Sequence, residues 1–244
     1  MSDQKILITI CARANSKGLP NKHMRIYADR YLIYWTVKQA HDWVKLSSLQ
    51  DDCKVVLFTD DITVENYVSK MELSLEFLTQ IIDRPYELST DTTLKLDCLR
   101  YILSRHKGQI KLLIDLDATN PVRTVQDIEN CYQMFLNNTH DVVMSATPAK
   151  ENPHFNQLQH WSSGWGLPTF SKADTYNRQE APEVYHVNSS IYVYNPEWLK
   201  DDKHKSPITD HLGVYIMPAY SRVDIDTQDD FDMSELMFRK YILQ

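Results

Sequence analysis

The chain has 244 residues, a formal net charge of −7, 43% hydrophobic residues and 24% charged residues. This composition supplies a core for one large α/β domain and excludes disorder as the dominant state. The negative charge excludes the broadly basic surface that non-specific nucleic-acid binding needs, and no run of roughly 18 apolar residues could span a membrane. The N-terminus lacks the pattern of a secretory signal, so a cytoplasmic location is expected.

Four cysteines are spread widely along the chain, at Cys11, Cys53, Cys98 and Cys131. None belongs to a C-x-x-C pair, the spacing that zinc sites and redox-active disulfides favour. We therefore expect them to be small buried side chains, and not a disulfide framework or a metal site.

Apolar strand patterns alternate with helical periodicity over the first 147 residues. Strands are predicted over 6–12, 54–58, 110–116 and 141–146, with a short one inside 73–81. Helices are predicted over 31–46, 62–71, 92–106 and 124–135, the last one capped by Thr124 and Asp127. The alternation predicts an α/β fold: a Rossmann-like, mostly parallel sheet with helices on both faces.

The pattern changes after Pro148. Residues 148–187 are rich in Pro, Asn, His and Trp and have weak periodicity, which indicates an excursion from the sheet and not a separate domain. Strand patterns return over 190–194, 214–217 and 222–225, and a helix is predicted over 228–242. Residues 1–147 and 188–244 are thus expected to form one core. Aromatic residues of the excursion favour an interface between subunits or a cover for the sheet edge: Trp161, Trp165, Tyr176 and Tyr185.

The loop after the first strand, residues 13–22, carries three cations, Arg13, Lys17 and Lys22, together with Gly18. Because ligands of parallel sheets bind beyond the carboxyl ends of strands, the loop is a candidate phosphate site. Gly18 could adopt a positive φ and turn backbone N–H groups toward an anion. The loop matches neither the P-loop nor the dinucleotide-binding motif, and a solvated basic turn is the alternative.

Two D-x-D pairs follow strand patterns. Asp115 and Asp117 end one predicted strand, and Asp224 and Asp226 end another. Alternate residues of a strand share a face, so each pair could hold Mg²⁺, which prefers oxygen ligands. Turn formation or helix capping, with Asp226 or Thr227 as N-cap, would explain the same residues without a metal.

Five segments occur in an order that resembles one family. They are CARANSKGLPNKHMR at 11–25, RPYELSTDT at 84–92, DATNPVRT at 117–124, the stretch from Arg178-Gln179 through Asn188 to Ile191-Tyr192, and VDIDTQDD at 223–230. Together they resemble the signatures of the CMP-nonulosonate synthetases, also called acylneuraminate cytidylyltransferases. The resemblance covers almost the whole chain. It implies the fold of nucleotide-diphospho-sugar transferases, a small dimerisation excursion, and the transfer of CMP from CTP to the anomeric hydroxyl of a nine-carbon acidic sugar, with release of pyrophosphate.

The resemblance also implies roles for individual residues. Nucleotide binding is expected at Arg13, Ser16, Lys17, Gly18, Lys22, Arg84, Thr92 and Thr93, with Arg84 on the cytosine side. Mg²⁺ is expected on Asp224 and Asp226, and catalytic roles at Arg13, Lys22 and Asp226. The sugar side is expected to include Asp117, Arg123, Arg178, Gln179 and Asn188, with Arg178 reaching the neighbouring subunit of a homodimer.

The chain departs from the family pattern at two positions. His23 stands where Asn is usual, which changes the local hydrogen bonding to nucleotide. Asp117 stands where the sialate enzymes have Gln, and together with NPHFN at 152–156 it resembles the bacterial branch that activates legionaminic acid. Legionaminate differs from sialate at amino and deoxy positions, so an acidic contact could report that difference. A CMP-Kdo or CMP-pseudaminate synthetase is the alternative within the family.

The expected reaction joins an anionic sugar to an anionic triphosphate, so cations are needed first. Mg²⁺ on the late aspartates would orient the attacking hydroxyl, and the early cations would offset charge on pyrophosphate. Asp226 and Asp117 are candidate bases. Two rivals remain: a metal-dependent glycosyltransferase with its metal on Asp115 and Asp117, and a silent nucleotide-binding protein, for which His23 is the sequence hint.

Overall fold

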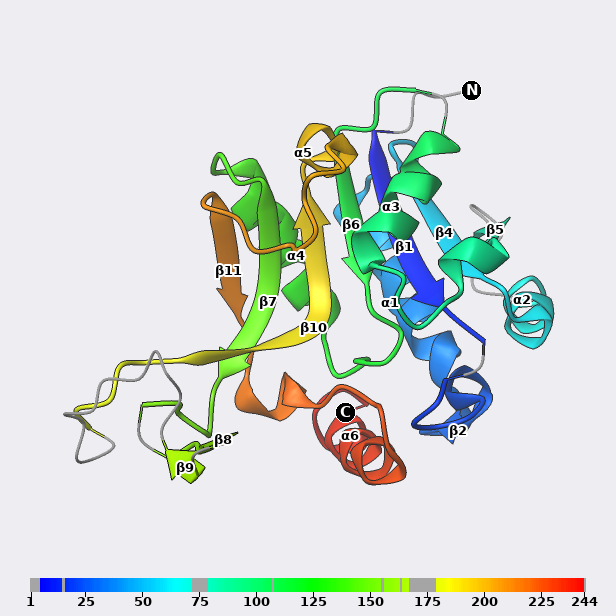
Figure 1. Ribbon diagram of the computed structural model, residues 1–244. Coiled ribbons are helices and arrows are strands. Elements are labelled where there is room, and N and C mark those ends of the chain that lie inside the picture. Colours follow the sequence, from blue (N-terminus) through cyan, green and yellow to red (C-terminus); the bar gives the residue numbers. More distant parts are fainter. Residues whose placement is uncertain are drawn as a thin grey trace.

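One twisted sheet forms the centre of the molecule (Figure 1). The computed structural model describes residues 5–14, 16–71, 79–106, 108–154, 156–162, 164–166 and 179–243. Within them, seven strands follow the order β11-β7-β10-β6-β1-β4-β5, and β10 alone is antiparallel to its neighbours. The strands are β1 (Ile6–Ala12), β4 (Cys53–Thr59), β5 (Gln80–Asp83), β6 (Leu112–Leu116), β7 (Val142–Pro148), β10 (Tyr185–Tyr194) and β11 (Leu212–Ile216).

Helices cover both faces of the sheet, which confirms the predicted α/β fold. On one face lie α1 (Leu32–Ser47), α2 (Ile62–Val68) and α4 (Val125–Leu136), and on the other α3 (Lys95–Ser104) and α5 (Pro196–Lys200). Side chains of β1 alternate between the two cores: Ile8 packs with the α1 side and Leu7 with the α3 side. The near-continuous apolar strands of the sequence therefore result from burial on both faces.

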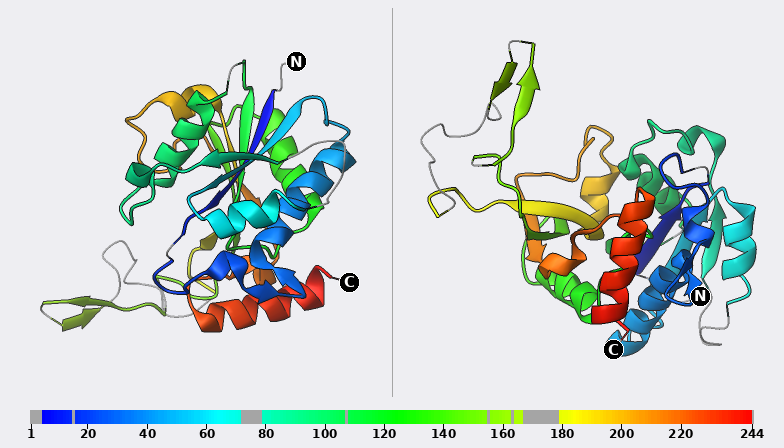
Figure 2. Two further views of the ribbon diagram at one scale, coloured as in Figure 1. Left: turned by 90° about the vertical axis from the view of Figure 1, so that its right-hand side faces the viewer. Right: turned by 90° about the horizontal axis from the view of Figure 1, so that it is seen from below.

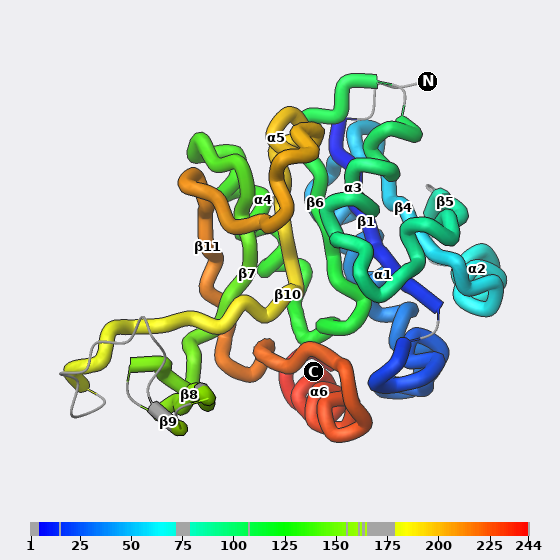
Figure 3. The backbone as a smooth tube through the Cα atoms, viewed as in Figure 1, coloured from blue at the N-terminus to red at the C-terminus, as the bar shows by residue number. Residues whose placement is uncertain are grey.

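The last helix, α6 (Gln228–Tyr241), crosses the carboxyl edge of the sheet instead of a face (Figure 3). Its Phe231 and Phe238 pack edge-on against Tyr27, with ring centroids 5.3 and 5.2 Å away. Tyr27 belongs to a small hairpin of β2 (Ile26–Tyr27) and β3 (Arg30–Tyr31), which follows the short helix η1 (Lys22–Met24). The C-terminal helix thus fixes the segment that follows the early cationic loop.

Predicted helix caps are present where the sequence places them. Thr124 and Asp127 form a reciprocal capping box at the start of α4, which confirms that prediction. The same arrangement starts α6, with Thr227 as N-cap and Asp230 as its partner. Thr227 is therefore the capping residue, and Asp226 is not needed for that purpose.

The predicted strand over 222–225 is wrong. Residues Ala219–Arg222 form a short 3-10 helix, η3, and the following segment is extended but forms no ladder. Val223 and Ile225 are buried, and the backbone N–H of Ile225 donates to the carbonyl of Thr119 at 3.0 Å. The alternation of apolar and polar residues over 222–225 therefore results from burial between neighbouring loops and not from strand pairing. Strand β5 spans 80–83, and most of the 73–81 prediction lies outside the described residues.

The excursion projects from the body of the molecule (Figure 2). Its described part contains a hairpin of β8 (Gln159–Trp161) and β9 (Gly164–Gly166), and the first residues of β10, which pair with the end of β7. The side chains of Trp161 and Trp165, and all of Tyr176, lie outside the described residues. Tyr185 is 48% exposed.

All four cysteines are free thiols, and burial raises the pKa of Cys53 to about 12. Cys53, Cys98 and Cys131 are buried, as expected from the sequence, whereas Cys11 is only half-buried. Across the residues that the structure describes, no helix is both long and apolar enough to cross a membrane.

Candidate active site

The loops after β1, β4 and β6 meet at one edge of the sheet, as the parallel arrangement requires. The chain runs outward from β1 to β4 and β5 in one direction and to β6 in the other, so the crevice lies at the topological switch point. The loops are tied together there: the backbone N–H of Ala14 donates to Asp60 Oδ1 at 2.7 Å.

The cationic loop closes directly on the late aspartates. Lys22 Nζ lies 2.7 Å from the carbonyl oxygen of Ile225 and 3.2 Å from Asp226 Oδ1. The side chain of Lys22 is 11% exposed, whereas that of Asp226 is 77% exposed and open to a ligand. The early cations and the late carboxylates, separated by some 200 positions, therefore share one site.

Gly18 is needed for close approach and not for a left-handed backbone. A Cβ at this position would lie 2.3 Å from the carbonyl oxygen of Asp226, so only glycine fits. The positive φ expected at Gly18 is absent, and Asn21 takes the left-handed conformation of this loop instead, with φ of 54°.

A single hydroxyl joins two of the carboxylates. Thr119 Oγ1 lies 2.8 Å from Asp117 Oδ1 and 2.6 Å from Asp224 Oδ1. One hydroxyl carries one proton and can satisfy only one of these acceptors at a time. Burial, together with the charges of Asp117 and Asp226, raises the pKa of Asp224, although the contact with Thr119 opposes this. Negative charge is thus concentrated where a cation would relieve it.

A second cluster, which the sequence analysis missed, lies beside the first. Lys95, the first residue of α3, places Nζ 3.0 Å from Asp115 Oδ2 and 3.0 Å from Asp117 Oδ2. Burial disfavours the ammonium, but the two carboxylates more than offset it, and the pKa of Lys95 is raised well above its ordinary value. The same burial acts on Asp117, yet Lys95 and the bonds from Thr119 hold the pKa of Asp117 far below its usual range.

Asp91 is a further residue to which the sequence gave no role. Its carboxylate pairs with Arg13 at 2.9 Å and with Lys17, and hydrogen bonds from these two cations lower the pKa of Asp91. Lys17 is mostly exposed and Ser16 is half-buried. The exposed ion pairs hold the two cations over the crevice, where a polyanion could take the place of Asp91.

Arg84 and the threonines of the second signature form one small patch. The guanidinium of Arg84 lies over the ring of Phe58, 5.5 Å from its centroid, and Nε donates to the carbonyl of Leu88 at 2.8 Å. The hydroxyl of Thr93 lies 2.8 Å from that of Thr90, and Thr92 is exposed. The cytosine contact expected at this patch stays a prediction.

Two residues expected on the sugar side are buried beneath the site. Arg123 has no exposed surface; Nη1 donates to the carbonyls of Asp117, Asn120 and Ser190 at 2.8–2.9 Å. Asn188 is equally buried and donates to the carbonyl of Ser221 at 2.8 Å. Direct contact of either side chain with a sugar is therefore not supported. They hold the loops that carry Asp117 and Asp224.

The remaining predicted residues are placed less fully. Gln179 is exposed, and Arg178 lies outside the described residues, so its reach into a neighbouring subunit stays a prediction. His23 is 5% exposed; burial and the charge of Lys22 lower its pKa to about 4. The imidazole is therefore neutral near pH 7, in place of the usual neutral amide.

The donor set fits Mg²⁺ better than a metal held only by protein. In the described residues no group of three or more His, Cys, Asp or Glu side chains could hold a metal ion. Mg²⁺ usually takes one or two carboxylates and fills its other positions with water and phosphate oxygens. Asp224 and Asp226 are the two carboxylates that could fill this role, and burial, together with the charges of Asp117 and Asp226, raises the pKa of Asp224.

A cationic loop facing a carboxylate pair at the switch point of a parallel sheet defines a protein that handles nucleotide phosphates. The cytidylyltransferase family model matches residues 7–238, and this chain belongs to that family. The predicted resemblance and the predicted class of enzyme, a nucleotidyltransferase, are thereby confirmed.

Relatives of the chain agree with this placement. It is 32% identical to post-translational flagellin modification protein B of Campylobacter coli, over 98% of this chain and 97% of that protein. It is 30% identical to the CMP-N,N'-diacetyllegionaminic acid synthase of Campylobacter jejuni, over 96% of this chain and 94% of that protein. The solved structure of CMP:2-keto-3-deoxy-manno-octonic acid synthetase complexed with CTP shares the fold, with a TM-score of 0.69. The match spans 98% of this chain and 100% of that chain, at 16% sequence identity.

Proposed function

We propose that this cytidylyltransferase is a CMP-nonulosonate synthetase, with legionaminic or N-acylneuraminic acid as the sugar. The oxygen of the anomeric hydroxyl attacks the α-phosphorus of CTP, the bond to the bridging oxygen breaks, and pyrophosphate leaves. The observation that carries the proposal is the contact of Lys22 with Ile225 and Asp226, which joins a triphosphate-binding loop to a carboxylate pair.

In this proposal the cations of the early loop bind and orient the triphosphate. Lys22 is held by the Ile225 carbonyl, so its ammonium stays at the carboxylate pair without needing a ligand. Arg13 and Lys17 are oriented by Asp91 and exchange that partner for the β- and γ-phosphates. Once Arg13 and Lys17 have exchanged Asp91 for phosphate, their positive charge offsets the negative charge that develops on pyrophosphate.

Asp224 and Asp226 would hold Mg²⁺, which supplies charge neutralisation between the two anionic substrates. The hydroxyl proton needs an acceptor. Asp117 is poorly suited because Lys95 and Thr119 each contact one of its oxygens and its pKa is depressed. Asp226, with its exposed side chain, is the better placed of the two candidate bases.

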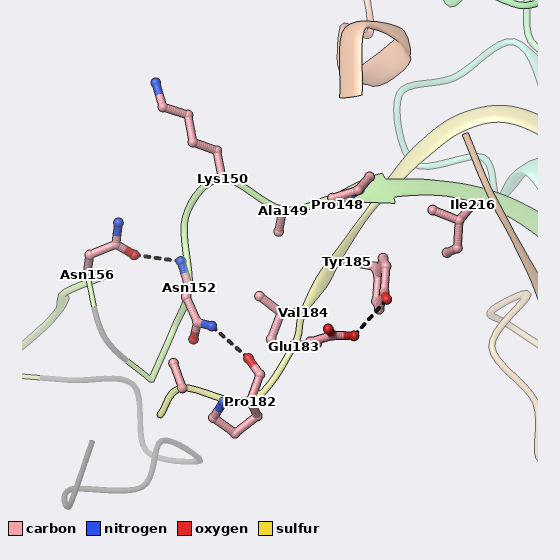
Figure 4. Close-up of a pocket in the computed structure, with 11 residues that line it drawn as sticks. Pro148, Ala149, Lys150, Asn152, Asn156, Pro182, Glu183, Val184, Tyr185 and Ile216 are labelled. Atoms are coloured by element: carbon pink, nitrogen blue, oxygen red, sulfur yellow. Dashed lines mark hydrogen bonds between the residues drawn. The ribbon is translucent and has the colours of Figure 1, made fainter. Parts of the chain in front are cut away.

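A homodimer and a cytoplasmic location, where CTP is available, complete the proposal. Polar and apolar side chains together line a cavity of about 520 Å³ at the root of the excursion (Figure 4). Among them Tyr185 and Ile216 are 48% and 42% exposed, and neighbouring Val187 is 40% exposed. Burial of this surface by a second copy would support the dimer inferred from the aromatic residues.

The test is a matrix of four nucleotides against four sugars, read as pyrophosphate release with Mg²⁺ present. CTP, UTP, ATP and GTP are each combined with N-acetylneuraminic, N,N'-diacetyllegionaminic, pseudaminic and Kdo acids. Release with CTP and a nine-carbon sugar is expected. Release with UTP or GTP alone would overturn the proposal, and transfer from a ready-made nucleotide sugar would favour the glycosyltransferase.

A further inference from the structure

Lys95 has no part in the proposed chemistry, yet it lies in the crevice. It is the first residue of α3, a position where the helix dipole disfavours a cation. Two carboxylates compensate: Asp115, fully buried below it, and Asp117, 21% exposed beside it. The side chain of Lys95 is itself 34% exposed, so it is not sealed off from the crevice.

Counting hydrogen bonds shows what this pair can still offer. An ammonium has three donors; Lys95 donates to Asp117 and forms an ion pair with Asp115, so at least one donor is left. Asp117 Oδ1 accepts from the backbone N–H of Thr119 at 2.9 Å and lies 2.8 Å from the Thr119 hydroxyl, which Asp224 shares, and Oδ2 accepts from Lys95. A carboxylate has about four acceptor sites, so one remains on Oδ2. The described contacts thus leave one donor and one acceptor on atoms 3.0 Å apart.

The charge of the cluster decides what kind of group it can bind. Lys95 carries +1 and Asp117 carries −1, so their sum with Asp115 is zero when Asp115 is protonated and −1 when it is ionised. In neither state does the cluster attract a carboxylate or a phosphate. A neutral group with one donor and one acceptor is the complementary ligand, and sugar hydroxyl and acylamino substituents provide both.

The location points to the sugar. Thr119 connects Asp117 to Asp224, so the pair lies next to the carboxylates that face the triphosphate. We propose that Lys95 and Asp117 form a specificity pair that reads neighbouring neutral substituents of the sugar, with Lys95 as a specificity-determining residue. This inference rests on the proposed function and adds to it: the pair selects among acidic sugars by their hydroxyl and acylamino groups, and their carboxylate binds elsewhere.

The test compares two sugars that differ in those substituents. Lys95→Arg keeps the charge but moves the donors, and Lys95→Gln removes the charge. The ratio of kcat/KM for N,N'-diacetyllegionaminic acid to that for N-acetylneuraminic acid is expected to change by about tenfold or more, because a hydrogen-bonding site discriminates strongly. The KM for CTP is expected to stay within about twofold in Lys95→Arg.

Arg100→Lys is the matched control, since Arg100 lies on the same helix and binds Asp97 and the carbonyl of Leu199, away from the crevice. It should leave the sugar ratio unchanged. If Lys95→Arg lowers kcat/KM for both sugars in parallel, or if Arg100→Lys shifts the ratio equally, Lys95 is only structural and the inference is rejected. If Lys95→Gln does not fold, Lys95→Arg decides. If the unmodified enzyme releases pyrophosphate with neither sugar, the proposed function itself is wrong, and this inference is rejected with it.

Discussion

Asp226 has an exposed side chain, although Ile225 just before it is fixed by its backbone N–H bond to the carbonyl of Thr119. Asp226→Asn removes one of the two charges proposed to hold Mg²⁺ and does not disturb packing. We expect kcat to fall by about 100-fold or more, with a melting temperature unchanged within about 1 °C. Pyrophosphate release and thermal unfolding measure the two effects.

Asp229→Asn is the control for that substitution, since Asp229 is also exposed and lies three positions on, in the first turn of α6. Its activity should stay near normal. Near-normal turnover in Asp226→Asn would reject Asp226 as a metal ligand.

Gly18 is restricted by the backbone of Asp226 and not by its own dihedral angle. Gly18→Ala would force the loop away, because the new Cβ would meet the Asp226 carbonyl oxygen at 2.3 Å. The contacts of Lys22 would lengthen, and we expect kcat/KM for CTP to fall by about tenfold or more. Asn21→Gly, in the same loop but at a left-handed position, adds no atom and should retain activity. Equal kinetics for the two variants would contradict this account.

Two buried histidines predict how stability depends on pH. Burial lowers the pKa of His23 and of His41 to about 4, while the ordinary value is 6.5. Between pH 6.5 and 4 the unfolded chain binds protons that the folded chain does not, so the free energy of unfolding falls with acidification. Each histidine is expected to lower the free energy of unfolding by about 2 kcal/mol when the pH falls from 7.5 to 5.0.

Urea unfolding at those two pH values tests this dependence. His23→Asn and His41→Asn should each reduce the difference between the two free energies by about that amount. An unchanged difference in both variants would show that other groups carry the acid sensitivity.

At the residue scale, the sequence predicts the members of the site better than their contacts. Lys22 and Asp226 are found because each lies in a recognisable segment. Lys95 and Asp91 are missed as working residues because their roles depend on partners that only the folded sheet brings close. For Arg123 the opposite holds: its motif is visible in the sequence and led to a predicted sugar contact, but the sequence does not show that the side chain is completely buried.

At the scale of elements, the cap of α6 controls where the aspartate segment ends. Thr227 and Asp230 bond reciprocally, and the backbone N–H of Asp226 also donates to Asp230 at 3.3 Å. Thr227→Ala should cost about 1 kcal/mol of stability and also raise the KM for CTP and Mg²⁺ severalfold, because Asp226 loses its support.

Thr124→Ala removes the equivalent cap from α4 and serves as the comparison. It should cost a similar amount of stability, measured by urea unfolding, with a smaller change in KM. If both variants change KM alike, the α6 cap has no special part in the site.

Elements with strong periodicity are predicted closely, and those set by tertiary contacts are not. The helices α1 and α4 lie within one residue of their predicted bounds. The supposed strand over 222–225 fails because Val223 and Ile225 are buried by loops, which produces the same alternation as a sheet. Strand β10 begins at Tyr185, five residues early, because its first part pairs with the end of β7 outside the main sheet body.

At the scale of the whole molecule, the projecting excursion is the feature that a monomer does not explain. Its root exposes Tyr185 and Ile216 at the cavity of Figure 4, and Val187, two positions after Tyr185 in β10, is exposed as well. Large exposed apolar patches mark interaction surfaces in proteins of this size. We therefore expect light scattering after size exclusion to give twice the 28.6 kDa mass of one chain.

Val187→Asp places a charge in this surface and should convert the dimer to monomers at micromolar concentration. Leu236→Asp, on α6 and 60% exposed, is the matched control and should remain dimeric, because α6 lies away from the excursion. A monomeric unmodified chain, or a Val187→Asp variant that stays dimeric, would refute this placement of the interface. If the excursion also completes the neighbouring site, as expected for Arg178, the Val187→Asp monomers will lose activity along with the dimer, whereas Leu236→Asp will keep both.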